Sequence, residues 1–300
     1  MAAAPLPAEP APESSAGFGM VVRGLLRYRS LVVGAVLLGL LVIAALAAPL
    51  ITSYSPTIAN PSLILLPPSW VHPFGTDQFG RDLLSRVLYG ARYTMLASLG
   101  AVLIGTIAGT LIGLVAGMAG GYVDLVLMRV VDLILIFPGI LPALAITAIL
   151  GPSLVNVAIA IGLSSIPVYA RVVQAVTLQT RQLTYVESAR AAGASPMWIT
   201  VRHVLPSVST QIIVSASTGL GVAVLWVAAL GFLGLGVQPP TPELGSMLSS
   251  GRDYVTLAWW ISFFPGLFIT IFIVAANLLG DGLRDLFDPH AIQRSLSVRR

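Results

Sequence analysis

The sequence predicts an all-α, polytopic membrane protein with six transmembrane helices. Of its 300 residues 56% are hydrophobic and only 9% are charged, too few charges to coat a soluble domain. Several charge-free apolar runs reach the roughly 20 residues that a helix needs to cross a hydrocarbon core of about 30 Å. The basic residues are all arginine and gather mainly at the ends of these runs. The pattern is typical of a bundle of membrane-spanning helices.

The six predicted spans follow one another along the chain. The apolar stretch between residues 132 and 171 is too long for one crossing and is interrupted by Gly151-Pro152. It therefore holds the end of the third span and all of the fourth. Pro138 and Pro142 are expected to kink the third span. The predicted spans are 31–51, about 93–116, a third starting near 122, about 153–172, about 207–230 and about 258–279.

The distribution of arginine predicts the orientation of the chain. If the N-terminus is cytoplasmic, most arginines lie on the inner side, and the outer side keeps only Arg81, Arg86, Arg92 and Arg252. This bias follows the positive-inside rule. Both termini are then expected in the cytoplasm.

The chain divides accordingly. Residues 1–20 are rich in Ala and Pro, and we expect a disordered cytoplasmic tail. A signal peptide cleaved near Ala47 is an alternative for the N-terminal region, but the apolar run is long for one, which favours an uncleaved first span. The further divisions are a first span with its preceding residues at 21–51, an extracytoplasmic loop at 52–92, a core of spans two to six at 93–280 that includes a cytoplasmic loop at 173–206, and a cytoplasmic C-terminal tail at 281–300.

The predicted cytoplasmic loop contains a polar, glycine-punctuated segment. Thr184 can cap a short helix, and Gly193 can end that helix in a left-handed conformation. Ser195-Pro196 then indicates the N-cap and first residue of a second helix, which we expect to end before Pro206. The segment is predicted to fold as helix, turn and helix.

The first of these two helices has a surface suited to a partner protein. Glu187 and Arg190 lie three residues apart on one face, and small residues surround them. A small, acidic helix fits a groove on another protein. An ordinary interfacial linker has the same pattern and stays open as an alternative.

The polar segment resembles the EAA loop of permease subunits of ATP-binding-cassette (ABC) importers. The signature corresponds here to Glu187-Ser188-Ala189, Gly193 and Leu205-Pro206, with Ser188 in place of the usual Ala. Three more stretches are similar to the second permease subunit of dipeptide and oligopeptide importers, the DppC/OppC type: HPFGTDQFGRDLLSRVLYGAR at 72–92, FLGLGVQPPTPELGSMLSSGRDY at 232–254 and NLLGDGLRDLFDP at 277–289. The resemblance covers roughly residues 31–289. A second departure is Val227, where relatives often carry Glu.

The resemblance implies the type I ABC importer permease fold and the import of di- and oligopeptides by alternating access across the bacterial cytoplasmic membrane. The implied partners are a second permease of the DppB/OppB type, two cytoplasmic ATPase domains, an extracytoplasmic substrate-binding protein and membrane lipid. ATP and Mg would bind in the partner subunits, so no cofactor is expected in this chain. Coupling to the ATPase is implied for Glu187, Ser188, Ala189, Arg190, Gly193, Leu205 and Pro206.

Other functions are weighed against this one. Nickel complexes or haem are alternative cargoes for the same machine. A stand-alone secondary transporter or channel is more remote, because such proteins usually contain inverted repeats and none is convincing here. The chain contains no Lys or Cys, and its three His are far apart in sequence. We therefore expect no enzyme activity and no metal site. The arginines are scattered at the ends of the apolar runs, which membrane orientation explains better than a nucleic-acid partner.

Some further residues have two interpretations each. Asp132 and Arg129 are expected to form a structural ion pair, with a proton or ion site as the alternative. Asp82 and Arg86 are expected to pair on an amphipathic helix that lies on the outer membrane face, either as a scaffold or as a surface for the binding protein. A stripe of small residues lets a helix approach closely, either within the bundle or from a second permease; it consists of Gly105, Gly109, Gly113 and Gly117.

Overall fold

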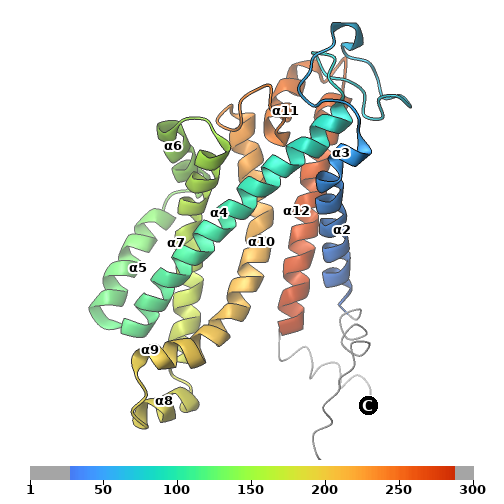
Figure 1. Ribbon diagram of the computed structural model, residues 1–300. Coiled ribbons are helices and arrows are strands. Elements are labelled where there is room, and N and C mark those ends of the chain that lie inside the picture. Colours follow the sequence, from blue (N-terminus) through green and yellow to red (C-terminus); the bar gives the residue numbers. More distant parts are fainter. Residues whose placement is uncertain (1–27, 288–300) are drawn as a thin grey trace, which may run out of the picture.

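The structure, a computed structural model, describes residues 28–287 and consists almost entirely of helices (Figure 1). Two consecutive helices, α5 (Gly121–Leu135) and α6 (Ile140–Leu150), are bent by 85° relative to each other, and counted as one broken span they bring the candidate spans to six. The five unbroken helices long and apolar enough to cross a membrane are α2 (Arg29–Leu46), α4 (Leu83–Ala119), α7 (Leu154–Thr180), α10 (Leu205–Phe232) and α12 (Trp260–Phe287). For the described residues, the all-α polytopic fold is confirmed.

Shorter elements cover the two ends of this bundle (Figure 1). One end carries α8 (Thr184–Ala191) and α9 (Pro196–Ile199). The opposite end carries α3 (Ala48–Ile51), α11 (Leu244–Gly251) and the loop that enters α4. The expected N-terminal tail at 1–20 lies outside the described residues, as do residues 288–300 of the expected C-terminal tail.

The glycine stripe of α4 packs against α7 of the same chain. A Cβ atom on Gly109 would lie 2.6 Å from the Cβ of Tyr169, and one on Gly117 would lie 2.6 Å from the Cβ of Thr177. Gly113 approaches the backbone of α7 as closely, since its Cβ would lie 2.6 Å from the carbonyl oxygen of Ala170. The stripe therefore serves packing within the bundle.

The bend between α5 and α6 confirms the predicted kink of the third span. Pro138 lies in the break and Pro142 in the first turn of α6. At these positions the missing N–H of proline breaks no hydrogen bond inside a helix. The predicted pairing of Asp132 with Arg129 is wrong. Oδ1 of Asp132 lies 2.9 Å from Nη2 of Arg171 on α7. This ion pair ties the broken span to the neighbouring helix.

The entrance to α4 also differs from the prediction. Leu83 starts α4 directly, and the first turns of this helix are buried, so no separate amphipathic helix lies on the membrane face. Asp82 does not pair with Arg86. Its Oδ2 accepts a hydrogen bond from the backbone N–H of Ser85 at 2.8 Å, which caps α4, and its Oδ1 lies 2.9 Å from Nδ1 of His72. The sequence spacing allowed the pair, but the loop folded over α4 supplies other partners.

Candidate functional site

The helix, glycine turn and helix predicted for the polar segment are present as α8 and α9. Gly193 has φ of +86°, the left-handed conformation. Its N–H donates to the carbonyl of Arg190 at 3.0 Å, and the N–H of Ala194 donates to the carbonyl of Ala189 at 3.1 Å. These two bonds form a Schellman motif, which ends α8 sharply. Ser195 begins α9 as predicted, because its Oγ accepts a hydrogen bond from the N–H of Trp198 at 3.3 Å.

Two local predictions are wrong. Thr184 is the first residue of α8 rather than its cap; the N-cap is Leu183, whose side chain makes no capping bond. The second helix does not end before Pro206. It continues through a π-helical turn at Thr200–Val204 directly into α10. Pro206 stands directly after the π turn, where the regular hydrogen-bond ladder of the α-helix is already interrupted.

Apolar anchors fix this hairpin to the bundle. Val186 of α8 is 0% exposed and Ile199 of α9 is 2% exposed. They pack together with Val173 of α7, and with Val204 and Val208 around the start of α10. Rigid attachment on one side leaves the other side of α8 free to contact another molecule.

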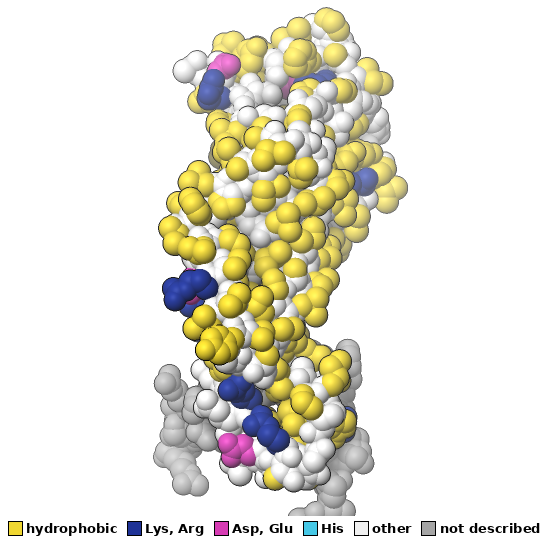
Figure 2. All heavy atoms as spheres, turned by 90° about the vertical axis from the view of Figure 1, so that its left-hand side faces the viewer, with side chains coloured by type: hydrophobic (Ala, Val, Ile, Leu, Met, Phe, Trp, Pro, Cys, Tyr) yellow, Lys and Arg dark blue, Asp and Glu magenta, His cyan; other side chains and the backbone are white. Residues whose placement is uncertain are grey.

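The exposed side of α8 carries most of the predicted site residues. Glu187, Ser188, Arg190 and Gly193 are exposed, and Ala189 is half-buried against the anchors. Leu205 and Pro206 are exposed too, but they belong to the first turn of α10. Figure 2 shows arginine and acidic side chains together at this end of the molecule, beyond the apolar surface of the spans. Among the described residues there is no group of three His, Asp or Glu that could hold a metal ion.

An aromatic cluster beside α8 was missed by reasoning from the sequence. The ring of His203 has its centroid 5.5 Å from that of Tyr185 on α8 and 5.0 Å from that of Trp198 on α9. Trp198 is half exposed and Met197 is 72% exposed, so the hairpin presents apolar surface next to its charges. The available signal was the presence of large aromatic side chains in an otherwise polar segment. Such a mixture is typical of protein interfaces.

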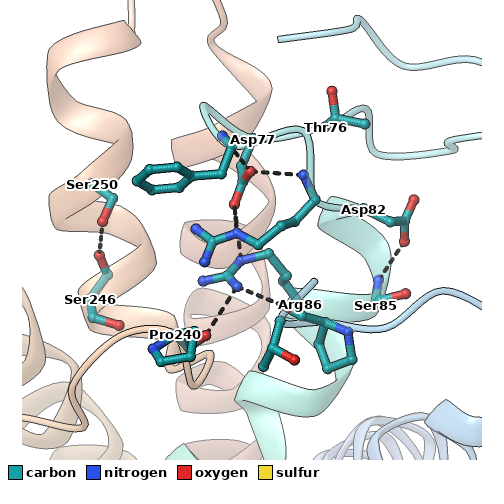
Figure 3. A network of polar contacts seen from close by, with 12 residues as sticks. Thr76, Asp77, Asp82, Ser85, Arg86, Pro240, Ser246 and Ser250 are labelled. Atoms are coloured by element: carbon teal, nitrogen blue, oxygen red, sulfur yellow. Dashed lines mark hydrogen bonds and ion pairs between the residues drawn. The ribbon is translucent and has the colours of Figure 1, made fainter. Parts of the chain in front are cut away.

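The opposite end of the bundle is held by a buried ionic network (Figure 3). Oδ2 of Asp77 lies 2.6 Å from Nε of Arg81 and 3.2 Å from Nε of Arg86. Nη1 of Arg86 also donates to the carbonyl of Pro56 at 2.6 Å and to that of Pro240 at 3.3 Å. The network therefore joins the loop before α4, α4 itself and the segment before α11. It favours the interpretation of this loop as a scaffold.

A second buried acid fixes α11. Glu243 is 1% exposed and accepts hydrogen bonds from the backbone N–H groups of Gly245 and Ser246, each at 2.8 Å. Thr94 of α4 donates to the same carboxylate at 3.2 Å. Burial raises the pKa of the Glu243 carboxyl, and the hydrogen bonds act against that rise. Val227 is buried in an apolar cluster, so this chain places no carboxylate at that position of α10.

Comparison with protein families relates these features to a known group. Residues 109–293 match the family described as "Binding-protein-dependent transport system inner membrane component". Residues 18–68 match the "N-terminal TM domain of oligopeptide transport permease C".

Individual relatives are similar over most of the chain. The "Di/tripeptide transport system permease protein DppC" of Pseudomonas aeruginosa is 45% identical over 256 residues, which are 83% of this chain and 84% of the relative. The "Dipeptide transport system permease protein DppC" of Alkalihalophilus pseudofirmus is 41% identical over 86% of this chain and 85% of its own. The "Glutathione transport system permease protein GsiD" of Shigella flexneri is 50% identical over 74% of this chain and 73% of its own. All three relatives are named as permease proteins, and the cargoes in their names are peptides.

Proposed function

This chain belongs to the family of binding-protein-dependent transport system inner membrane components, and on that premise we propose how it works in peptide import. It is a multi-pass inner-membrane permease subunit of an ABC importer for peptides. As a permease it conducts rather than converts its cargo. The relatives named as di- or tripeptide permeases favour a peptide cargo over nickel complexes or haem.

The proposed role of α8 is to couple ATP hydrolysis in a partner to movement of the spans. The single observation that carries this proposal is the construction of the hairpin: a short helix with Glu187 and Arg190 exposed, which buried Val186 and Ile199 hold rigidly to α7 and α10. Moving a two-state gate from 1:99 to 99:1 takes about 5.5 kcal/mol of differential stabilisation. A helix that cannot move independently of the spans can transmit such a difference. Glu187, Ser188, Ala189, Arg190 and Gly193 would contact the ATPase, with Leu205 and Pro206 connecting the hairpin to α10.

The assembly that we propose contains four kinds of partner. A second permease of the DppB/OppB type completes the pathway, two cytoplasmic ATPase domains bind ATP and Mg, and an extracytoplasmic binding protein delivers the peptide. In this arrangement the α8 end is cytoplasmic, together with both termini, and the 52–92 loop is extracytoplasmic. The positive-inside distribution of arginine supports that orientation.

Purification of the tagged chain from its native membrane in mild detergent tests the proposal. We expect a second permease and an ATPase to co-elute, with peptide-stimulated ATP hydrolysis after addition of the binding protein. Glu187→Gln should weaken retention of the ATPase and lower hydrolysis and uptake together. Asp253→Asn is the matched control, because it makes the same change from carboxylate to carboxamide at an exposed side chain, just after α11 at the opposite end of the bundle.

Two results would count against the proposal. A homo-oligomer without associated ATPase activity would favour a stand-alone transporter. Equal ATPase retention by Glu187→Gln and Asp253→Asn would remove the role of α8 while leaving the permease assignment intact.

A further inference from the structure

A cavity of about 350 Å³ lies among α4, α7, α10 and α12, close to the middle of the bundle. Its volume is within the range of small-molecule sites, which starts at roughly 300 Å³. Much of the lining is apolar, including Ile161 of α7 and Val222 of α10. The cavity is distinct from the α8 surface and from the ionic network at the other end.

Polar side chains from three different helices converge on this cavity. They are Ser165 and Tyr169 of α7, Ser215 and Thr218 of α10, and Asn277 of α12. Each lies near the middle of its span, at the depth of the hydrocarbon core. Asn277 is exposed on the surface of this chain. A carboxamide that faced lipid at this depth would have no hydrogen-bond partner, which is unfavourable. The Asn277 side chain therefore faces water, cargo or protein, whereas the hydroxyls of Ser165 and Thr218 also donate to carbonyls of their own helices.

The polar lining continues along one face of α10. Ser207, Gln211, Ser215 and Thr218 are spaced by four, four and three residues, so they form a stripe from the α8 end of α10 to the cavity. Ile213, at a similar depth on the opposite side of α10, is an exposed apolar residue. Ser209 and Ser217 lie one turn before and after Ile213, but their hydroxyls donate to carbonyl groups of α10 itself and neither lines the cavity. The stripe that ends at Ser215 and Thr218 is the polar row of α10 that reaches the cavity.

Toward the α11 end of the cavity the same face of α10 becomes apolar. Val222 and Trp226 are the next residues on it, and both line the cavity. The Trp226 ring packs against the bend between α5 and α6: a Cβ on Gly139 would lie 3.0 Å from Cζ2 of Trp226. An apolar constriction next to a polar stretch can close a pathway by excluding water.

The charge of the lining limits what the cavity can do. No Asp, Glu, Arg or His lines it, so it cannot hold the charged termini of a peptide strongly. Hydroxyl and carboxamide groups can exchange hydrogen bonds with peptide amides, which every peptide carries. A passage must bind cargo well enough to admit it and weakly enough to release it.

We propose that this cavity and the polar stripe of α10 are the surface over which a peptide passes through this chain, reached from the α8 end and closed toward the α11 end by Val222 and Trp226. The inference rests on the proposed function and names the part of the pathway that this subunit supplies. The occupant is the uncharged backbone of a short peptide together with water. Groups that recognise particular side chains of the peptide would lie outside this cavity.

Single cysteines test the proposal directly, because the chain contains none of its own. Ser215→Cys and Asn277→Cys are introduced into the complete transporter in vesicles, and Ile213→Cys is the control at matched depth. Each is treated with a membrane-impermeant, sulfonate-bearing methanethiosulfonate and, separately, with a lipophilic maleimide; mass spectrometry of this chain gives the labelling rates. We expect the first two cysteines to react with the charged reagent about tenfold or more faster than the control, because the thiolate is the reactive form and apolar surroundings suppress it. Addition of a transported peptide together with the binding protein and ATP should slow their labelling.

The outcomes separate this inference from the proposed function. If Ser215→Cys and Asn277→Cys react only with the maleimide, or with neither reagent because a second permease covers them, the cavity is not the passage. Should those same variants still import peptide in an ATP-dependent way, the proposed function stands and only this inference fails. Loss of ATP-dependent import by the cysteine-free wild type would overturn the proposed function itself.

Discussion

Replacing Gly193 tests whether the sharp end of α8 matters for coupling. The residue has φ of +86°, and a Cβ built there meets no atom within 4 Å. A substitution therefore costs only the backbone strain of the left-handed conformation, about 1–2 kcal/mol for an ordinary residue. A β-branched side chain is accommodated less well than others. Asn tolerates this conformation and is the matched control.

The expected effect follows from these energies. If Gly193→Val avoids this strain by adopting a right-handed turn, it loses instead the two hydrogen bonds of the Schellman motif, each worth about 0.5–1.5 kcal/mol. Either cost can reach about 1.4 kcal/mol, which reduces the population of the native turn relative to alternatives by about tenfold. We expect Gly193→Val to lower ATP-dependent peptide uptake by about tenfold or more, and Gly193→Asn to retain most of it.

Uptake of labelled peptide into vesicles, normalised to the amount of assembled complex, is the assay. ATP hydrolysis is measured on the same vesicles, because uncoupling should lower uptake more than hydrolysis. Val and Asn variants that transport at the same rate as wild type would refute the reasoning. Equal losses in both would show that the position needs glycine for a reason other than its φ angle.

Three other perturbations have defined outcomes. Asp77→Asn should destabilise the purified protein by about 3–5 kcal/mol in thermal unfolding because it leaves two buried arginines without their carboxylate, whereas Arg252→Gln at an exposed pair should cost less than about 1 kcal/mol. Gly109→Ala should cost about 1–3 kcal/mol and lower the yield of folded protein, since its Cβ would lie 2.8 Å from a backbone oxygen of α7; Gly39→Ala, with nothing within 4 Å, should not. Burial raises the pKa of Glu243 above its ordinary 4.5, so the folded state binds this proton more tightly than the unfolded chain does. The stability of the protein should therefore fall as pH rises from the unfolded-state pKa through the higher folded-state pKa. A Glu243→Gln variant should lack this pH dependence, and identical pH profiles of melting temperature for the variant and the wild type would contradict the argument.

Local sequence signals predicted the hairpin well where a few neighbouring residues decide the conformation. Gly193 ends α8, and Ser195-Pro196 starts α9, because a left-handed turn and an N-cap depend on backbone geometry within one or two turns. Thr184 shows the limit. Its hydroxyl could cap a helix, but Leu183 occupies the capping position, since burial of Val186 sets where α8 begins on the bundle.

The partners of charged residues could not be predicted in the same way. Sequence spacing suggested Asp132 with Arg129 and Asp82 with Arg86, pairs that a single helix allows. The structure pairs Asp132 with Arg171 and Arg86 with Asp77, across separate elements. Spacing along one helix contains no information about which side chain a neighbouring element brings close.

The sequence by itself determined that this chain is a polytopic membrane protein, because apolar runs of sufficient length have few other stable locations than lipid. It also determined the turn at Gly193, and its motifs indicated the permease family that the comparisons show. Only the tertiary structure decided which face of α10 is polar toward a cavity and which residues of α7 and α12 join it there. The physical reason is that helix rotation and neighbours are set by packing contacts such as those of the α4 glycines against α7, which join residues far apart in the chain.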